Sequence, residues 1–212
     1  MKKIVFILLF FVAFVTRGQQ KLTIDEKGNN LKSFYLSLNV ENLWIAEHHI
    51  NWETGEPDEP NAKYSIRTHC SAFVASACKR LNIYILRPPE HVQGLLANAQ
   101  YDWLQTSEAI DKGWKQIDDE NAYTIAQQYA NKGYVVVAVI NNPIPKKPGH
   151  IALVMPSEIS EQELEDSGPV IIMASTHNHN FISLKAGFKS HITSWPERKI
   201  LFYYNINLPS YP

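Results

Sequence analysis

The chain has 212 residues, 45% of them hydrophobic, with 20 basic and 21 acidic side chains and a formal charge of −1. This length is typical of one domain with a hydrophobic core of its own. A nearly neutral composition imposes no basic surface, which argues against nucleic acid or an anionic membrane as the main partner.

The first residues have the layout of a secretory signal peptide. Lys2 and Lys3 precede an uncharged apolar run from Ile4 to Val15, which is too short to span a bilayer comfortably. A retained membrane anchor is the alternative. We predict that residues 1–19 are removed and that residues 20–212 form a single periplasmic or secreted domain without further membrane contact. Without the first 20 residues the chain keeps 17 basic and 21 acidic residues, a formal charge of −4.

Helices are predicted in the first part of the mature chain. Apolar residues recur at helical spacing from Leu31 onward, so we expect a helix over residues 31–49. A polar loop with glycine and proline follows up to Arg67, and a compact apolar helix then runs from Cys70 to Leu81. Two more helices are expected over residues 88–104 and 118–131, the second ending before Gly133.

Strands are predicted in the second part. Continuous apolar runs at residues 134–140, 151–155 and 170–174 are typical of buried strands, and residues 188–191 and 200–204 are further candidates. Helices followed by strands indicate an α+β domain, in which N-terminal helices pack on an antiparallel sheet.

The two cysteines are predicted to be free thiols. Cys70 and Cys78 are eight residues apart within one expected helix, which separates their Cα atoms by about 12 Å, whereas a disulfide requires less than about 7 Å. Cys78 lies two turns into an apolar helix and is interpreted as core. An exported chain that keeps an unpaired cysteine suggests chemistry at that sulfur, although a buried structural thiol is the alternative for Cys70.

Cys70 and His150 have the placement expected of a nucleophile and its base. Cys70 begins a helix, where unpaired backbone amides favour the thiolate and can bind an oxyanion. His150 follows Gly149 and begins an apolar strand, so its imidazole is expected at the rim of the sheet, facing that helix. A hydrogen-bonded strand histidine is the alternative for His150.

Two segments resemble the papain-like NlpC/P60 and CHAP families. Their nucleophile segment resembles Thr68-His69-Cys70-Ser71-Ala72-Phe73-Val74, and their base strand resembles Gly149-His150-Ile151-Ala152-Leu153-Val154. The resemblance spans roughly residues 64–188 and departs from the family at His69, where aspartate is common. It implies a papain-like fold and a cysteine peptidase or amidase that hydrolyses peptide or amide bonds, commonly in peptidoglycan peptides.

The resemblance also implies a third polar residue on the next strand, where this chain has Met173. Strand alternation then favours His177 as the third catalytic residue, with Asn178 or a dyad without any third side chain as alternatives. Tyr64 resembles the tyrosine that assists the oxyanion site in these families; an ordinary loop aromatic is the alternative.

No cofactor or metal is predicted. The histidines lack a recognised zinc spacing such as His-Glu-x-x-His, so a metal site is the weaker interpretation. We therefore expect an exported cysteine hydrolase acting through a thioester on Cys70, with a peptide or peptidoglycan-derived substrate. The alternatives are an acyltransferase using the same two residues and an inactive binding domain of the same fold.

Overall fold

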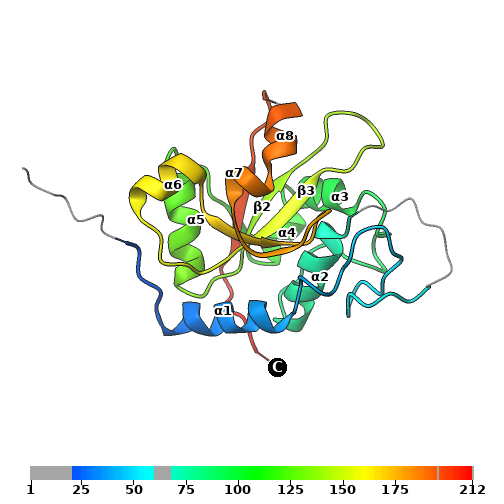
Figure 1. The fold of residues 1–212 in the computed structure, drawn as a ribbon, viewed down its shortest axis with the longest axis horizontal. Helices are drawn as coiled ribbons and strands as arrows, with labels where there is room; N and C mark the ends of the chain where they lie inside the picture. Colours follow the sequence, from blue (N-terminus) through cyan, green and yellow to red (C-terminus); the bar gives the residue numbers. More distant parts are fainter. Residues whose placement is uncertain (1–20, 60–67, 195, 212) are drawn as a thin grey trace, which may run out of the picture.

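A computed structural model describes residues 21–59, 68–194 and 196–211 of the chain. It shows an α+β fold built on a six-stranded antiparallel sheet, with strand order β1-β6-β2-β3-β4-β5 (Figure 1). The strands are β1 (Trp114–Gln116), β2 (Val136–Ile140), β3 (His150–Val154), β4 (Val170–Met173), β5 (His179–Ser183) and β6 (Leu201–Asn205). The helices are α1 (Glu26–Ser37), α2 (Cys70–Arg80), α3 (Leu96–Trp103), α4 (Ser107–Asp111), α5 (Ala122–Asn131), α6 (Glu161–Ser167), α7 (Leu184–Gly187) and α8 (Lys189–Ser194).

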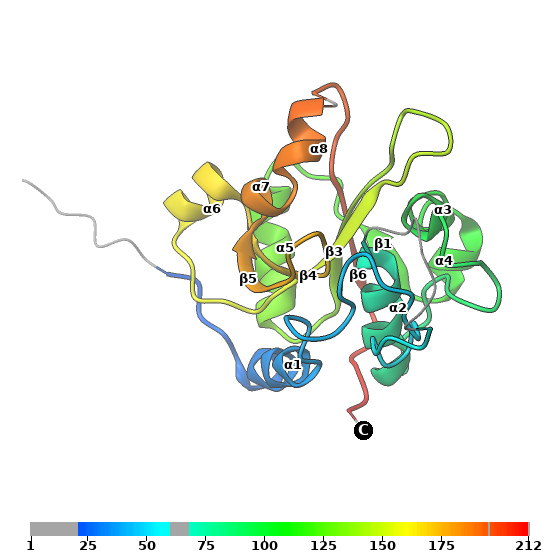
Figure 2. The same cartoon turned by 45° about the vertical axis from the view of Figure 1, so that its right-hand side comes forward.

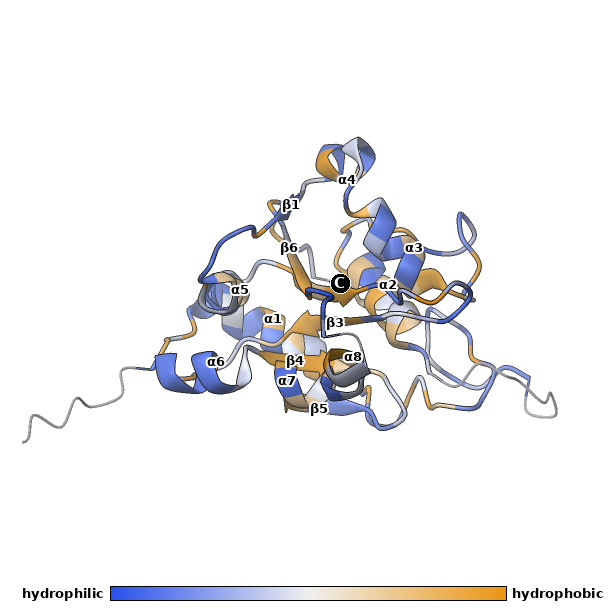
Figure 3. Ribbon diagram, turned by 90° about the horizontal axis from the view of Figure 1, so that it is seen from above, coloured by the Kyte–Doolittle hydropathy of each residue, from blue (hydrophilic) through white to orange (hydrophobic). Residues whose placement is uncertain are grey.

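The central strands are buried on both faces, which explains their continuous apolar sequences. Alternation along β3 sends Ile151 and Leu153 to one face, which we call the α2 face, and Ala152 and Val154 to the other, which we call the α5 face. Viewed from above, strands β3, β4 and β6 are largely hydrophobic, whereas α6 is mostly hydrophilic (Figure 3).

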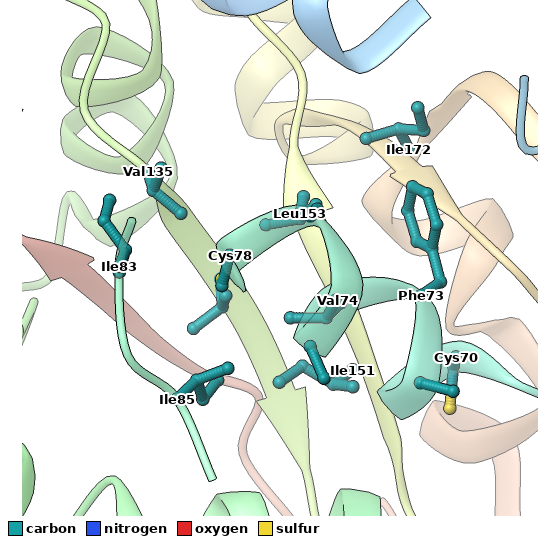
Figure 4. Close-up of a cluster of buried hydrophobic side chains, with 14 of the residues drawn as sticks. Cys70, Phe73, Val74, Cys78, Ile83, Ile85, Val135, Ile151, Leu153 and Ile172 are labelled. Carbon is teal, nitrogen blue, oxygen red and sulfur yellow. The ribbon is translucent and has the colours of Figure 1, made fainter. Parts of the chain in front are cut away.

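Helix α2 is the central helix of the α2 face. Every residue from Cys70 to Cys78 is buried, and Phe73 and Val74 pack in the same cluster as Ile151 (Figure 4). Because alanines and serines occupy much of this helix, it can approach the sheet closely. Figure 2 shows α2 beside the strands, on a different side of the sheet from α5.

The structure confirms the predicted α+β class, the helix that begins at Cys70 and the three central strands, and it describes both cysteines as free. It corrects the first helix, which starts at Glu26 behind the N-cap Asp25 and ends at Ser37. Positive φ angles at Asn39, Trp44 and Glu47 are incompatible with a helix continuing to residue 49.

Two further helices are shorter than predicted. The helix expected over residues 88–104 is present only as α3, since Leu95 has a φ of 58° immediately before it. The helix expected from residue 118 begins at Ala122, after a turn in which the Asp119 side chain accepts the Asn121 N–H; Gly133 follows its end as expected.

The strand predicted at residues 188–191 is wrong, because this segment is helical. Ser183 caps α7 by accepting the Ala186 N–H, and α8 follows directly, so Leu184 and Phe188 are buried at a spacing of one helical turn. Strands β1 and β5 and helices α4 and α6 were not predicted. Among the described residues, no helix is long and apolar enough to cross a membrane.

Candidate functional site

Cys70 is the first residue of α2 and is only 5% exposed. Burial raises the pKa of its thiol, while hydrogen bonds from backbone N–H groups, that of Ile151 first, act in the opposite direction. The sulfur therefore lies at the amide end of the helix and beside the backbone of β3. Figure 4 shows this sulfur at the end of α2, two turns from Cys78.

The beginning of β3 has an open side, which explains how the sulfur reaches its backbone. On one side β3 pairs with β2 along its length, from His150 with Ile140 to Leu153 with Val137. On the other side, the ladder with β4 joins only Leu153 to Ile172 and Val154 to Ile171 within the described chain. Because β4 has already diverged at the start of β3, the Ile151 N–H can point to Cys70 instead.

His150 is the first residue of β3 and is 3% exposed. Its ring makes an edge contact with Phe188 at 4.7 Å between centroids and lies parallel to the ring of His191 at 4.9 Å and 8°. Burial, with a smaller contribution from His191, lowers the pKa of His150 to about 3. Its buried Nε2 atom has no hydrogen-bond partner among the described residues.

The structure brings the Ile151 N–H, which follows His150 in the chain, to Cys70 but directs the His150 imidazole elsewhere. We expected the imidazole to face α2; instead it packs against Phe188, a member of the α5-face cluster. The reason is strand alternation, since Ile151 occupies the α2 face and its neighbour must point away. Thiol and imidazole thus approach the open start of β3 from opposite faces.

His177, the predicted third residue, is exposed in the turn between β4 and β5 and lines a cavity of about 500 Å³. The Asn178 side chain forms hydrogen bonds with other groups. Its Nδ2 donates to the carbonyls of Val40 and Leu43 at 2.8 Å each, and its Oδ1 accepts the Ser175 N–H. Neither side chain forms a hydrogen bond or ring contact with His150 in the described structure. Met173 lies on the α5 face with His150, but a thioether is too weak an acceptor to orient an imidazole.

His191 is the neighbour of His150 that the sequence analysis missed. It lies on α8, is half-buried, and has a pKa lowered by burial. The signal in the sequence is the spacing of three residues between Phe188 and His191, which is typical of a helix and not of the predicted strand. Tyr64 and the predicted signal peptide lie outside the described residues.

Two residues near the thiol are structural. His69 is the N-cap residue of α2 but is 2% exposed and directs its Nε2 to the His48 carbonyl at 2.9 Å, which joins the preceding loop to the helix. Cys78 is fully buried, and burial raises its pKa to about 12, in agreement with its interpretation as core.

Within residues 21–59, 68–194 and 196–211, no three histidine, cysteine or acidic side chains are grouped so that they could hold a metal ion. No family model, curated protein or solved structure matches this chain. The function of this chain is therefore argued from its own residues, from the geometry of Cys70, His150 and His191 and from the two sequence segments around Cys70 and His150.

Proposed function

We propose that this chain is a cysteine hydrolase that cleaves a peptide or amide bond through a thioester on Cys70. The observation that carries the proposal is the position of the sulfur, at the amide end of a buried central helix and beside the Ile151 N–H, one residue from His150. A thiol with a purely structural role can be buried anywhere in the core, as Cys78 in the middle of the same helix illustrates.

The chemistry follows from these groups. His150 takes the thiol proton, and the Cys70 sulfur adds to the substrate carbonyl, whose oxygen accepts hydrogen bonds from backbone N–H groups. The carbon–nitrogen bond breaks as His150 returns the proton to the leaving amine. Water, deprotonated by His150, then hydrolyses the thioester, releases the acid and restores the thiol.

This mechanism requires the His150 ring to leave His191 on the α5 face and to reach the thiol around the open start of β3. The movement breaks no hydrogen bond at Nε2, because that atom has no partner among the described residues. What is lost is the burial of the ring and its packing against Phe188 and His191, where each aromatic pair contributes about 0.5–1.5 kcal/mol beyond burial. A substrate that binds beside Cys70 can supply that free energy.

The finer assignment rests on the two segments around Cys70 and His150 that resemble NlpC/P60 and CHAP enzymes. On this basis the fold is papain-like and the substrate is a peptide of the bacterial cell wall, met in the periplasm or outside the cell after export. An acyltransferase would use the same thioester and differ only in the acceptor.

A binding domain without catalytic activity is the second candidate. The orientation of His150 and the burial that raises the pKa of Cys70 favour it, as does an apolar residue, Met173, on the sheet face beside His150. Such a protein would hold the same class of peptide without cleaving it.

Alkylation of Cys70 by a chloromethyl ketone built on a cell-wall peptide separates the two candidates. The rate is measured from pH 5 to 9 on Cys78→Ala, which removes the second thiol, and on Cys78→Ala/His150→Ala. For the hydrolase we expect this reaction at pH values well below the ordinary thiol pKa of about 8.5, because the probe itself fills the substrate site, and we expect its loss without His150. A rate that follows an ordinary or slower thiol, with and without His150, would contradict the enzyme and leave the binding domain.

A further inference from the structure

A cavity of about 510 Å³ lies on the α5 face, between α5, α8 and the beginning of β6. It is separate from Cys70, which belongs to the α2-face cluster. Its apolar wall includes Ile117 and Phe202, both nearly buried, and Tyr123, whose ring makes an edge contact with Phe202 at 5.8 Å. This volume and wall are typical of a site for a small organic molecule.

The charged residues around this cavity are mostly basic. Four basic side chains line it against two acidic ones, Asp118 and Asp119, although the whole chain has a formal charge of −1. The four are Lys185, Lys189, Arg198 and Lys199. Composition therefore does not impose this local excess of positive charge, which must come from the way the fold gathers α7, α8 and residues 198–199.

Most of this positive charge has no ion-pair partner among the described residues. Lys185 is engaged, since its Nζ donates to the carbonyls of Glu165 and Asp166. Arg198 has one long contact of 3.5 Å with the Asn141 side chain, and neither it nor Lys189 or Lys199 forms an ion pair with a described residue. Cations that line an apolar cavity without an ion-pair partner concentrate anions there, because low-dielectric walls focus the field.

From this combination we propose that the cavity binds a small organic anion, a carboxylate or sulfonate carried on an apolar body. The apolar body lies against Ile117, Tyr123 and Phe202, and the anionic group meets Lys189, Arg198 or Lys199. The proposal is independent of the chemistry at Cys70, whose sulfur lies among the side chains of the other face.

The probe for a test is 1-anilinonaphthalene-8-sulfonate, which combines an aromatic body with one anionic group and fluoresces when bound in an apolar site. We expect one molecule bound per chain, an affinity that falls with salt, and displacement by 4-phenylbutyrate at lower concentration than by the neutral 4-phenylbutan-1-ol. The double substitution Arg198→Gln/Lys199→Gln should raise the dissociation constant at least fivefold.

Two variants complete the design. Lys146→Gln/Lys147→Gln removes the same charge from an exposed loop and should leave the dissociation constant unchanged. Ile192→Asp places a negative charge on the cavity wall at an exposed position and should raise the dissociation constant of the probe at least tenfold. If Arg198→Gln/Lys199→Gln and Ile192→Asp both bind the probe as the unaltered chain does, or if 4-phenylbutan-1-ol competes as well as 4-phenylbutyrate, the proposal is wrong.

Discussion

Burial controls the protonation of both side chains at the proposed centre. It raises the pKa of Cys70 and lowers the pKa of His150 to about 3, so thiol and imidazole are both neutral near pH 7 in the free protein. An ion pair between them is therefore not formed in advance. The thiolate has to arise when substrate is bound and His150 has turned to the sulfur.

The buried histidine also makes stability depend on pH. Its folded pKa is depressed, so the neutral form is favoured in the fold, and its contribution is present above the unfolded pKa of about 6.5. That contribution is lost as the pH falls from about 6.5 toward 3. We expect His150→Phe, which retains a ring but does not titrate, to lose less stability on acidification than the unaltered chain.

Urea unfolding at several pH values between 7.5 and 4.5 measures this difference. The carboxylates are the same in both proteins, so their contribution cancels in the comparison. A parallel loss of stability in the two proteins would show that His150 does not carry the effect.

Asn178 and His177 should differ sharply when each is replaced by alanine. Asn178→Ala leaves the Val40 and Leu43 carbonyls without their donor and should lower the free energy of unfolding by about 1–3 kcal/mol. His177→Ala removes an exposed side chain and should change it by less than about 0.5 kcal/mol. Thermal unfolding of both variants measures this, and a loss of alkylation specific to His177→Ala would restore His177 as a catalytic candidate.

The beginning of β3 is the element on which the proposed centre depends. A Cβ atom on Gly149 would lie 2.3 Å from the Ile140 carbonyl oxygen and 2.6 Å from the Asn98 side chain, so only glycine allows β3 to start there. Alanine at this position would displace the strand that carries both His150 and the Ile151 N–H.

We therefore expect Gly149→Ala to cost about 1–3 kcal/mol of stability and to change the alkylation rate of Cys70. Gly94→Ala is the matched control, because a Cβ there meets no atom within 4 Å and should change stability by less than about 0.5 kcal/mol. Equal stability of the two variants in urea would show that β3 can start without this close approach.

At the scale of the whole molecule, buried amides of α5 join segments that are distant in the sequence. Asn131 donates to the carbonyls of Thr23 and Ser157 at 3.1 and 3.0 Å and accepts the Ser157 N–H, while Gln127 donates to the Met155 carbonyl at 2.9 Å. These bonds connect the described N-terminal segment, α5 and the end of β3.

Asn131→Ala should cost roughly 3 kcal/mol, because several buried backbone groups lose their partners together. Gln128→Ala, on the exposed side of the same helix, should cost less than about 0.5 kcal/mol. Denaturant unfolding compares the two, and the alkylation rate of native Cys70 should be the same in both. A change in that rate would mean that this network also controls the start of β3.

The sequence alone determined the elements whose signal is local. The apolar helix from Cys70 and the buried strands β2, β3 and β4 were predicted because hydrophobic periodicity and β-branched runs report directly on burial. Separation along a helix likewise sufficed to predict two free cysteines. Helix ends were predicted less well, because they depend on residues with positive φ angles such as Asn39 and Leu95, and no sequence pattern predicts those angles.

Only the tertiary structure decided the surroundings of the proposed centre. Which face of the sheet α2 covers determines that Ile151, not His150, points at it, and the divergence of β4 determines that the Ile151 N–H meets the sulfur. His191 lies 41 residues further along the chain and contacts His150 from α8, in a segment that the sequence predicted as a strand. Contacts of this kind depend on how whole elements pack, and that information is distributed over the entire core instead of residing in any one motif.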